Sequence, residues 1–227
     1  MRHLKTISAT WLGLLLSFGV IVAAVHAEVE PPKALLEATS HQMFDALNAN
    51  RDRIKQDPNV TQELIEELLM PHIDFIAASK WVLGQNWDSA SKEQKIGFIK
   101  AFRTLLLRFY SSALTEYLVN NDEKLEASMM TFQEPGKPAN GQITVRSEVH
   151  PKSGKAVPIN YQMHLTKKGW KVYDVSVEGV SVITTYKTSF ASEIQQSGLD
   201  ALIVSLNERN KRLLAGDKSV LKVNHNQ

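Results

Sequence analysis

The 227-residue sequence contains no cysteine. Disulfide bonds, zinc sites built on thiolates and the lipid anchor of a bacterial lipoprotein all require cysteine, so the sequence excludes all three. Packing of apolar side chains must therefore stabilise the fold. About 200 residues are enough to enclose a substantial core in one domain.

An excess of charge is also absent. The chain has 26 basic and 24 acidic residues, and the first 27 residues hold Arg2 and Lys5 but no acid, so the remainder carries 24 of each sign. A balanced chain gives no electrostatic basis for binding nucleic acid or for strong attachment to anionic lipid.

Long hydrophobic runs are scarce, and the clearest one is Trp11 to Val25, which follows Arg2 and Lys5. This run is shorter than the roughly 20 residues of a membrane-spanning helix, and Val25-His26-Ala27 places small residues where a signal peptidase reads them. The pattern predicts a secretory signal peptide over residues 1–27, with a retained membrane anchor as the alternative. Cleavage would release a chain from Glu28, whose natural compartment is the periplasm.

Familiar catalytic and metal-binding motifs are missing as well, including phosphate-binding Gly-rich loops, His-Glu-x-x-His and calcium loops. The segment Gly179 to Ile183 begins like a nucleophile elbow, but Ile183 stands where the second glycine is required. His72 and Asp74 are two candidate metal ligands without a third, so we interpret them as a surface or capping pair. His164 belongs to a polar strand face that is solvated or covered by a helix.

Asp174 is the one acidic residue that could carry chemistry. On a regular strand it shares a face with Trp170, Val172 and Ser176. It could be the buried general base of a cavity enzyme. It could also hold a neighbouring backbone or basic group, which is the interpretation that we favour.

Apolar residues at helical spacing predict three helices in the first half of the chain. The first covers about Lys33 to Asn48, and the second begins after Pro58 and ends at Pro71. The third covers Ser91 to Val119 and opens with a capping box between Ser91 and Gln94. A helix of that length would be about 42 Å long, more than the diameter of a small domain, so we expect a bend or break.

A period of two then predicts four strands, at about Leu125–Met129, Ile143–Val149, Val157–Leu165 and Trp170–Val177. Short turn-like links predict an antiparallel meander. Helical spacing returns after Gly179, and Gly198 separates a last helix. The expected organisation is a domain over residues 28–215, with helices at about 33–119, a sheet at about 124–178, helices at about 181–214 and a polar tail at 216–227.

Four ordered segments resemble the MlaC family of periplasmic phospholipid-binding proteins, also known as toluene-tolerance auxiliary proteins. The most characteristic is Tyr173-Asp174 followed by Glu178-Gly179-Val180-Ser181-Val182-Ile183-Thr184-Thr185. The others are Leu69-Met70-Pro71-His72-Ile73-Asp74, then Val82-Leu83-Gly84 with Ser89-Ala90-Ser91-Lys92-Glu93-Gln94, then Gly198-Leu199-Asp200-Ala201-Leu202. The resemblance spans about Leu35 to Arg209. One departure is Thr185-Tyr186-Lys187, where many relatives carry Asn-Tyr-Arg. Lysine keeps the positive charge of arginine but lacks its planar fork.

The resemblance implies an α+β fold, in which helices wrap a strongly curved four-stranded antiparallel sheet around an apolar cavity, as in nuclear-transport-factor-like domains. It implies a phospholipid carrier that is not an enzyme, with phospholipid as cargo and no cofactor. The implied partners are the outer-membrane lipoprotein MlaA with its porin and the inner-membrane Mla ABC transporter, in a system that maintains outer-membrane lipid asymmetry. Two alternatives remain: a cavity enzyme that uses Asp174, and a periplasmic chaperone or adaptor that exposes an apolar patch.

The residues that we expect to line the cavity are apolar positions of the strands and of the long helix: Val157, Ile159, Tyr161, Met163, Val172, Val175, Val180, Leu105, Leu106 and Phe109. Strict alternation along a strand places Val172 and Val175 on opposite faces, so only one of the two should face the cavity. Val180 follows the Glu-Gly turn, and we expect its side chain to point inward.

Overall fold

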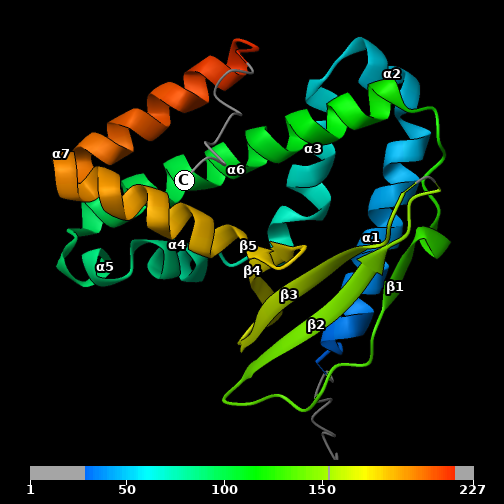
Figure 1. The fold of residues 1–227 in the computed structure, drawn as a ribbon, viewed down its shortest axis with the longest axis horizontal. Helices are drawn as coiled ribbons and strands as arrows, with labels where there is room; N and C mark the ends of the chain where they lie inside the picture. The colour runs from blue at the N-terminus through cyan, green and yellow to red at the C-terminus, as the bar shows by residue number, and fades with distance from the viewer. Residues whose placement is uncertain (1–28, 153, 218–227) are drawn as a thin grey trace, which may run out of the picture.

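The computed structural model describes residues 29–152 and 154–217. The predicted signal peptide and residues 218–227 of the predicted tail lie outside the described residues. The longest helix, α6 (Lys92–Asn120), runs along the long dimension of the molecule and joins its two halves. Figure 1 shows α7 (Val182–Leu214) and α4 (Phe75–Leu83) beside one half of α6, with α1 (Pro32–Ala49) and the sheet toward the other.

Three predicted helices are present, and their ends agree closely with the sequence pattern. They are α1, α3 (Asn59–Leu68) and α6. The capping box of α6 is confirmed, since the Ser91 hydroxyl accepts from the Gln94 amide at 3.1 Å and the Gln94 side chain accepts from the Ser91 amide at 2.9 Å. The expected break in α6 is wrong, because all 29 residues form one helix. Different apolar partners along its two halves stabilise the whole length.

Several short helices were not predicted from the sequence. They are α2 (Arg51–Gln56), η1 (Met70–His72), α4 and α5 (Gln85–Ser89). Lys80 is the one charged residue in α4, so this helix shows no alternation of polar and apolar faces that would reveal it. Asp74 fixes its start, because one carboxylate oxygen accepts from the Ile76 and Ala77 amides at 3.0 and 2.9 Å.

The sheet is an antiparallel meander in chain order, as expected, but it has five strands. They are β1 (Met130–Phe132), β2 (Gln142–Val149), β3 (Val157–Thr166), β4 (Gly169–Val177) and β5 (Val180–Ser181). The strand expected at Leu125–Met129 is wrong, since η2 (Ala127–Met129) is a 3₁₀ turn that precedes β1. The fifth strand forms because Glu178 and Gly179 adopt φ of 51° and 83° and reverse the chain onto β4.

A β-bulge interrupts the pairing of β3 with β4. Gln162 pairs with Asp174, but Met163 pairs with Val172, which leaves Tyr173 as the extra residue. A bulge shifts the side-chain alternation by one position. Val172 and Val175, whose cross-strand partners Met163 and Tyr161 share a face of β3, therefore lie on the same face of β4. The expectation of opposite faces is wrong, because it assumed a regular strand.

The last helix, α7, is turned at Gly198, as the sequence indicated. Gly198 has φ 82° and ψ 167°, which is not helical. The second half of α7 consequently folds back and lies along α6 (Figure 1). In the described residues no helix is both long and apolar enough to cross a membrane.

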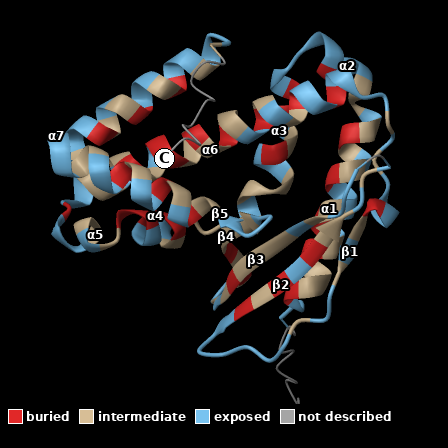
Figure 2. Ribbon diagram, in the orientation of Figure 1, coloured by how far each residue is buried: buried red, intermediate tan, exposed pale blue. Residues whose placement is uncertain are grey.

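Within the part of the chain that the structure describes, the buried side chains form three clusters instead of one continuous core. Figure 2 shows buried positions on the helices of both halves and on the sheet. The α4–α6–α7 cluster is built around Phe98, Phe102 and Phe190. The α1–α3 cluster packs on the C-terminal half of α6 and includes Leu47 and Ile65. The sheet cluster packs β2, β3 and β4 on the first turns of α1. α6 belongs to the first two clusters, and this explains why it stays helical throughout.

Candidate functional site

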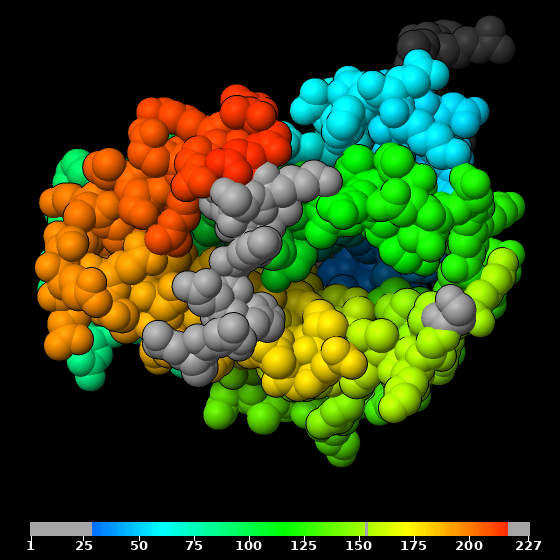
Figure 3. All heavy atoms as spheres, turned by 45° about the horizontal axis from the view of Figure 1, so that its top comes forward, coloured from blue at the N-terminus to red at the C-terminus, as the bar shows by residue number. Residues whose placement is uncertain are grey.

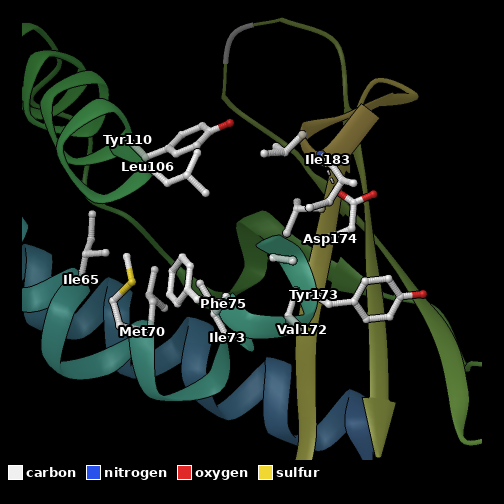
Figure 4. A pocket seen from close by; sticks show the side chains of 14 residues that line it. Ile65, Met70, Ile73, Phe75, Leu106, Tyr110, Val172, Tyr173, Asp174 and Ile183 are labelled. Atoms are coloured by element: carbon white, nitrogen blue, oxygen red, sulfur yellow. Dashed lines mark hydrogen bonds between the residues drawn. The ribbon is translucent and has the colours of Figure 1, made fainter. Parts of the chain in front are cut away.

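A pocket of about 230 Å³ lies where the three clusters approach one another. Figure 4 shows side chains entering it from α3, η1 and α4 on one side, from α6 above and from β4 and the start of α7 on the other. Its lining is almost entirely apolar. The lining residues are Ile65, Leu69, Met70, Ile73, Phe75, Ala78, Leu106, Tyr110, Val172, Tyr173, Asp174, Val175, Val182 and Ile183.

Each cluster contributes one wall of this pocket. Ile65 belongs to the α1–α3 cluster, Ala78 and Ile183 to the α4–α6–α7 cluster, and Val172 to the sheet cluster. Protein interiors are normally filled to the density of organic crystals. Here the three clusters pack internally and leave apolar space between them, so the pocket is a property of their arrangement.

β4 supplies four consecutive lining residues because of its bulge. Val172 and Val175 present their side chains on one face, although they are three positions apart. β4 is also bound to the segment before α4, since the Asp74 amide donates to the Val172 carbonyl at 2.8 Å. This hydrogen bond holds η1 and α4 against the strand and so fixes the wall.

Asp174 is the one carboxylate in the lining, and its oxygens already have partners. One accepts from the Ser181 hydroxyl at 2.7 Å, and the other accepts from the Ile183 amide at 3.0 Å. Ser181 in turn accepts from the Thr184 amide at 3.0 Å as the N-cap of α7. Asp174 thus binds the first turn of α7 to β4, which is the structural role that we favoured for it. It also places Val182 and Ile183 at the pocket.

Two tyrosines border the pocket, and both stay protonated at neutral pH. Burial raises the pKa of Tyr110 and of Tyr173, and the negative charge of Asp174 raises both further. Among the described residues no lysine, arginine or histidine lines the pocket. The site therefore offers apolar contact and very little charge.

His72 and Asp74, which we interpreted as a surface or capping pair, are not among the lining residues. Asp74 caps α4, and its second oxygen lies 3.0 Å from Nε2 of His164. Burial lowers the pKa of His72, and the charge of Lys171 lowers it further. No group of three metal-ligating side chains occurs in residues 29–152 and 154–217.

Three of the ten predicted lining residues, Leu106, Val172 and Val175, do line this pocket. The other seven are placed elsewhere. Met163 and Leu105 are buried inside the sheet and α4–α6–α7 clusters, and Val157, Ile159, Tyr161 and Phe109 are partly buried away from the lining. Val180 is 60% exposed in β5, where it pairs with Val177, so the expectation of an inward side chain is wrong. Val182, the first residue of α7, lines the pocket instead.

The prediction missed the contribution of α3, η1 and α4, namely Ile65, Leu69, Met70, Ile73, Phe75 and Ala78. The segment Leu69 to Asp74 carried a signal, because it is one of the four blocks of the family resemblance. Periodicity alone could not say whether its apolar residues fill a core or line a pocket.

The surface is hollowed next to these elements. Figure 3 shows the hollow between α6, drawn in green, and the yellow and lime strands, with blue α1 at its floor. α6 and β4 also form two of the walls of the pocket (Figure 4). The space between the long helix and the sheet is thus incompletely filled both inside the protein and at this surface.

Comparisons with known proteins agree with this arrangement. The family model described as MlaC protein matches residues 37–208. An intermembrane phospholipid transport system binding protein from Haemophilus influenzae is 28% identical over 88% of this chain and 91% of its own. A toluene tolerance protein from Pseudomonas putida is 26% identical over 83% of each chain. A crystal structure of a phospholipid-binding protein from Ralstonia solanacearum, in complex with a phospholipid, superposes with a TM-score of 0.68 at 26% identity, covering 80% of this chain and 98% of that one.

Proposed function

The chain belongs to the MlaC family, and on that basis we propose that it binds phospholipid in the apolar pocket and carries it between membranes. The observation that supports this proposal most directly is a nearly uncharged pocket between three separate apolar clusters. Acyl chains need apolar contact and no catalytic group. The match to a phospholipid-bound structure over most of this chain supports the same conclusion.

The energetics of the cargo explain why such a pocket is required. Moving about 30 chain methylenes into water costs on the order of 24 kcal/mol at about 0.8 kcal/mol each. A carrier must offer a comparable dry surface. Apolar side chains left uncovered between clusters provide it without new chemistry.

The pocket must widen to accept two acyl chains. Its volume of about 230 Å³ is below the roughly 300–1,000 Å³ of typical ligand pockets. α6 packs on two clusters and β4 on a third, so separation of α6 from β4 would enlarge the pocket toward the neighbouring hollow (Figures 3 and 4). In this proposal Leu106 and Tyr110 move with α6, while Val172 and Val175 stay with the sheet.

The cellular role that we propose follows from the family. A cleaved signal peptide over residues 1–27 would deliver the chain to the periplasm. There it would exchange phospholipid with the outer-membrane lipoprotein MlaA and its porin, and with the inner-membrane Mla ABC transporter, and so maintain outer-membrane lipid asymmetry. The name of the Haemophilus influenzae relative, an intermembrane phospholipid transport binding protein, supports this role.

The enzyme alternative gains no support from Asp174, because both of its oxygens accept hydrogen bonds that hold α7. Lipid extraction tests the carrier proposal. Protein purified from the periplasm should yield about one phospholipid or more per chain by mass spectrometry, with an unrelated periplasmic protein as the blank. Folded protein that stays free of lipid, even after incubation with phospholipid vesicles, would contradict the proposal.

A further inference from the structure

The solvent-facing side of α4 is unusually apolar for a surface helix. Ile76, Ala77, Lys80 and Trp81 follow one another at helical spacing on the side away from the buried residues. Ile76 is 61% exposed and Trp81 is 52% exposed. Surface helices usually present charged residues outward. Apart from Lys80, both sides of α4 are apolar, and Ile76 and Trp81 on the outer side stay more than half exposed.

Aromatic rings continue this stripe onto the sheet. The ring of Trp81 stacks on that of Tyr173, with centroids 6.2 Å apart and planes 18° apart. His164 meets Tyr173 edge-on at 5.5 Å. Figure 4 shows the ring of Tyr173 directed away from the other lining side chains, since Tyr173 is the bulged residue of β4. We call Ile76, Trp81 and Tyr173 the aromatic ledge.

Three lysines surround the aromatic ledge. Lys80 lies on the same stripe, Lys171 is the cross-strand partner of His164, and the side chain of Lys187 approaches Gly84 at the end of α4. None of the three ammonium groups pairs with a carboxylate within the described ranges. The carboxylate at the start of α4, Asp74, is occupied by its capping hydrogen bonds and by His164. This surface is therefore apolar at its centre and has three lysines at its edge, of which Lys171 donates to the Pro71 carbonyl at 2.6 Å, while the nearby carboxylates of Asp74 and Asp174 are held in hydrogen bonds.

The aromatic ledge and the pocket are two sides of one wall. Phe75 and Ala78 line the pocket from the inner side of α4, while Ile76 and Trp81 belong to its outer side. β4 repeats the arrangement, with Val172 inside and the Tyr173 ring outside. Only the thickness of α4 and β4 would therefore separate the pocket from anything bound to the aromatic ledge.

We propose that the aromatic ledge docks onto the surface of an anionic phospholipid bilayer. Trp and Tyr rings combine an apolar body with a polar tip and suit the bilayer interface, and nearby lysines attract anionic head groups. Exposed aromatic and aliphatic side chains with lysines beside them complement the apolar boundary and the anionic head groups of such a bilayer, which favours a membrane as the occupant. The chain as a whole has no charge excess, so docking is weak and reversible, as a carrier requires. This proposal rests on the proposed carrier function.

Vesicle flotation tests the proposal, using the full mature chain and vesicles of phosphatidylglycerol and phosphatidylcholine in a 1:1 ratio. We expect binding to these vesicles at 50 mM salt, little binding to pure phosphatidylcholine, and release at 500 mM salt. Trp81→Ala should reduce binding about tenfold, and Lys80→Glu with Lys187→Glu should reduce it more than tenfold, since one charge near an anionic surface contributes about a factor of five. The matched controls are Val204→Ala, at a 61% exposed position of α7, and Lys100→Glu on α6.

Equal binding by the Trp81 variant and the Val204 control would overturn the proposal. So would binding that appears only when the vesicles contain membrane proteins, because the ledge would then serve a protein partner. Lipid extracted from purified Trp81→Ala protein separates the two proposals. An unchanged lipid content with lost flotation supports the ledge, whereas wild-type protein that never contains lipid contradicts the carrier function itself.

Discussion

Val172 and Val175 lie three residues apart on β4, yet both side chains line the same pocket. The bulge at Tyr173 makes this possible by shifting the alternation of the strand. The same bulge turns the Tyr173 ring outward toward Trp81. The bulged residue thus allows both valines to line the pocket and places the stacked rings of Trp81 and Tyr173 on the outer surface.

Val175→Glu should remove bound lipid without unfolding the protein. An unpaired carboxylate among acyl chains costs several kcal/mol or must take up a proton, so we expect about a tenfold or greater loss of phospholipid per chain. Mass spectrometry of extracted lipid measures the loss, and thermal melting checks the fold. Val177→Glu is the matched control, since Val177 is exposed on the same strand. Equal lipid content in the two variants would remove Val175 from the site.

Asp174→Ala should destabilise the protein by about 1–3 kcal/mol, because the Ser181 hydroxyl and the Ile183 amide lose their acceptor. Asp174→Asn keeps one acceptor and should cost less. Urea unfolding measures both, with Glu178→Ala as an exposed control. Bound lipid should remain in the folded fraction of each variant. A variant that keeps wild-type stability would show that Asp174 does not hold the start of α7.

Tyr161 should make the fold sensitive to alkali. Burial raises its pKa to about 12, so the folded protein holds this proton more tightly than the unfolded chain, whose tyrosines titrate near 10. The resulting contribution is present below pH 10 and is lost as the pH rises toward 12, about 3 kcal/mol in all. Urea unfolding at pH 9 and at pH 11.5 should show a smaller decrease for Tyr161→Phe than for wild type. If exposed Tyr117→Phe reduces the decrease equally, the effect does not belong to Tyr161.

Gly198→Ala and Gly97→Ala should change stability in opposite directions. Gly198 has φ 82° and ψ 167°, a conformation that only glycine adopts readily, so alanine should cost about 1–3 kcal/mol. Gly97 lies inside α6, and an added Cβ would meet Ile203 atoms at 3.6 Å, an ordinary contact. Alanine there should stabilise the helix by up to about 1 kcal/mol. Thermal melting compares the two, and a stabilised Gly198 variant would mean that α7 need not turn there.

The sequence by itself determined the elements whose signals are local. Helical spacing and the capping box located α1, α3 and α6, alternation located β2, β3 and β4, and Gly198 marked the turn in α7. The order of four short segments indicated the family, which the family model confirms over residues 37–208. Each of these signals is contained within a few turns or a few strand residues, so no knowledge of distant contacts is needed.

Only the tertiary structure decided which apolar residues face the pocket. Leu105 and Leu106 are neighbours in one helix, but Leu105 is buried in a cluster while Leu106 lines the pocket. Met163 and Val172 pair across the sheet, and only Val172 reaches the pocket. Apolar side chains have the same pattern in a sequence whether they fill a core or surround a pocket. The difference depends on how three separately packed clusters stand apart, and on a bulge that no periodicity reveals.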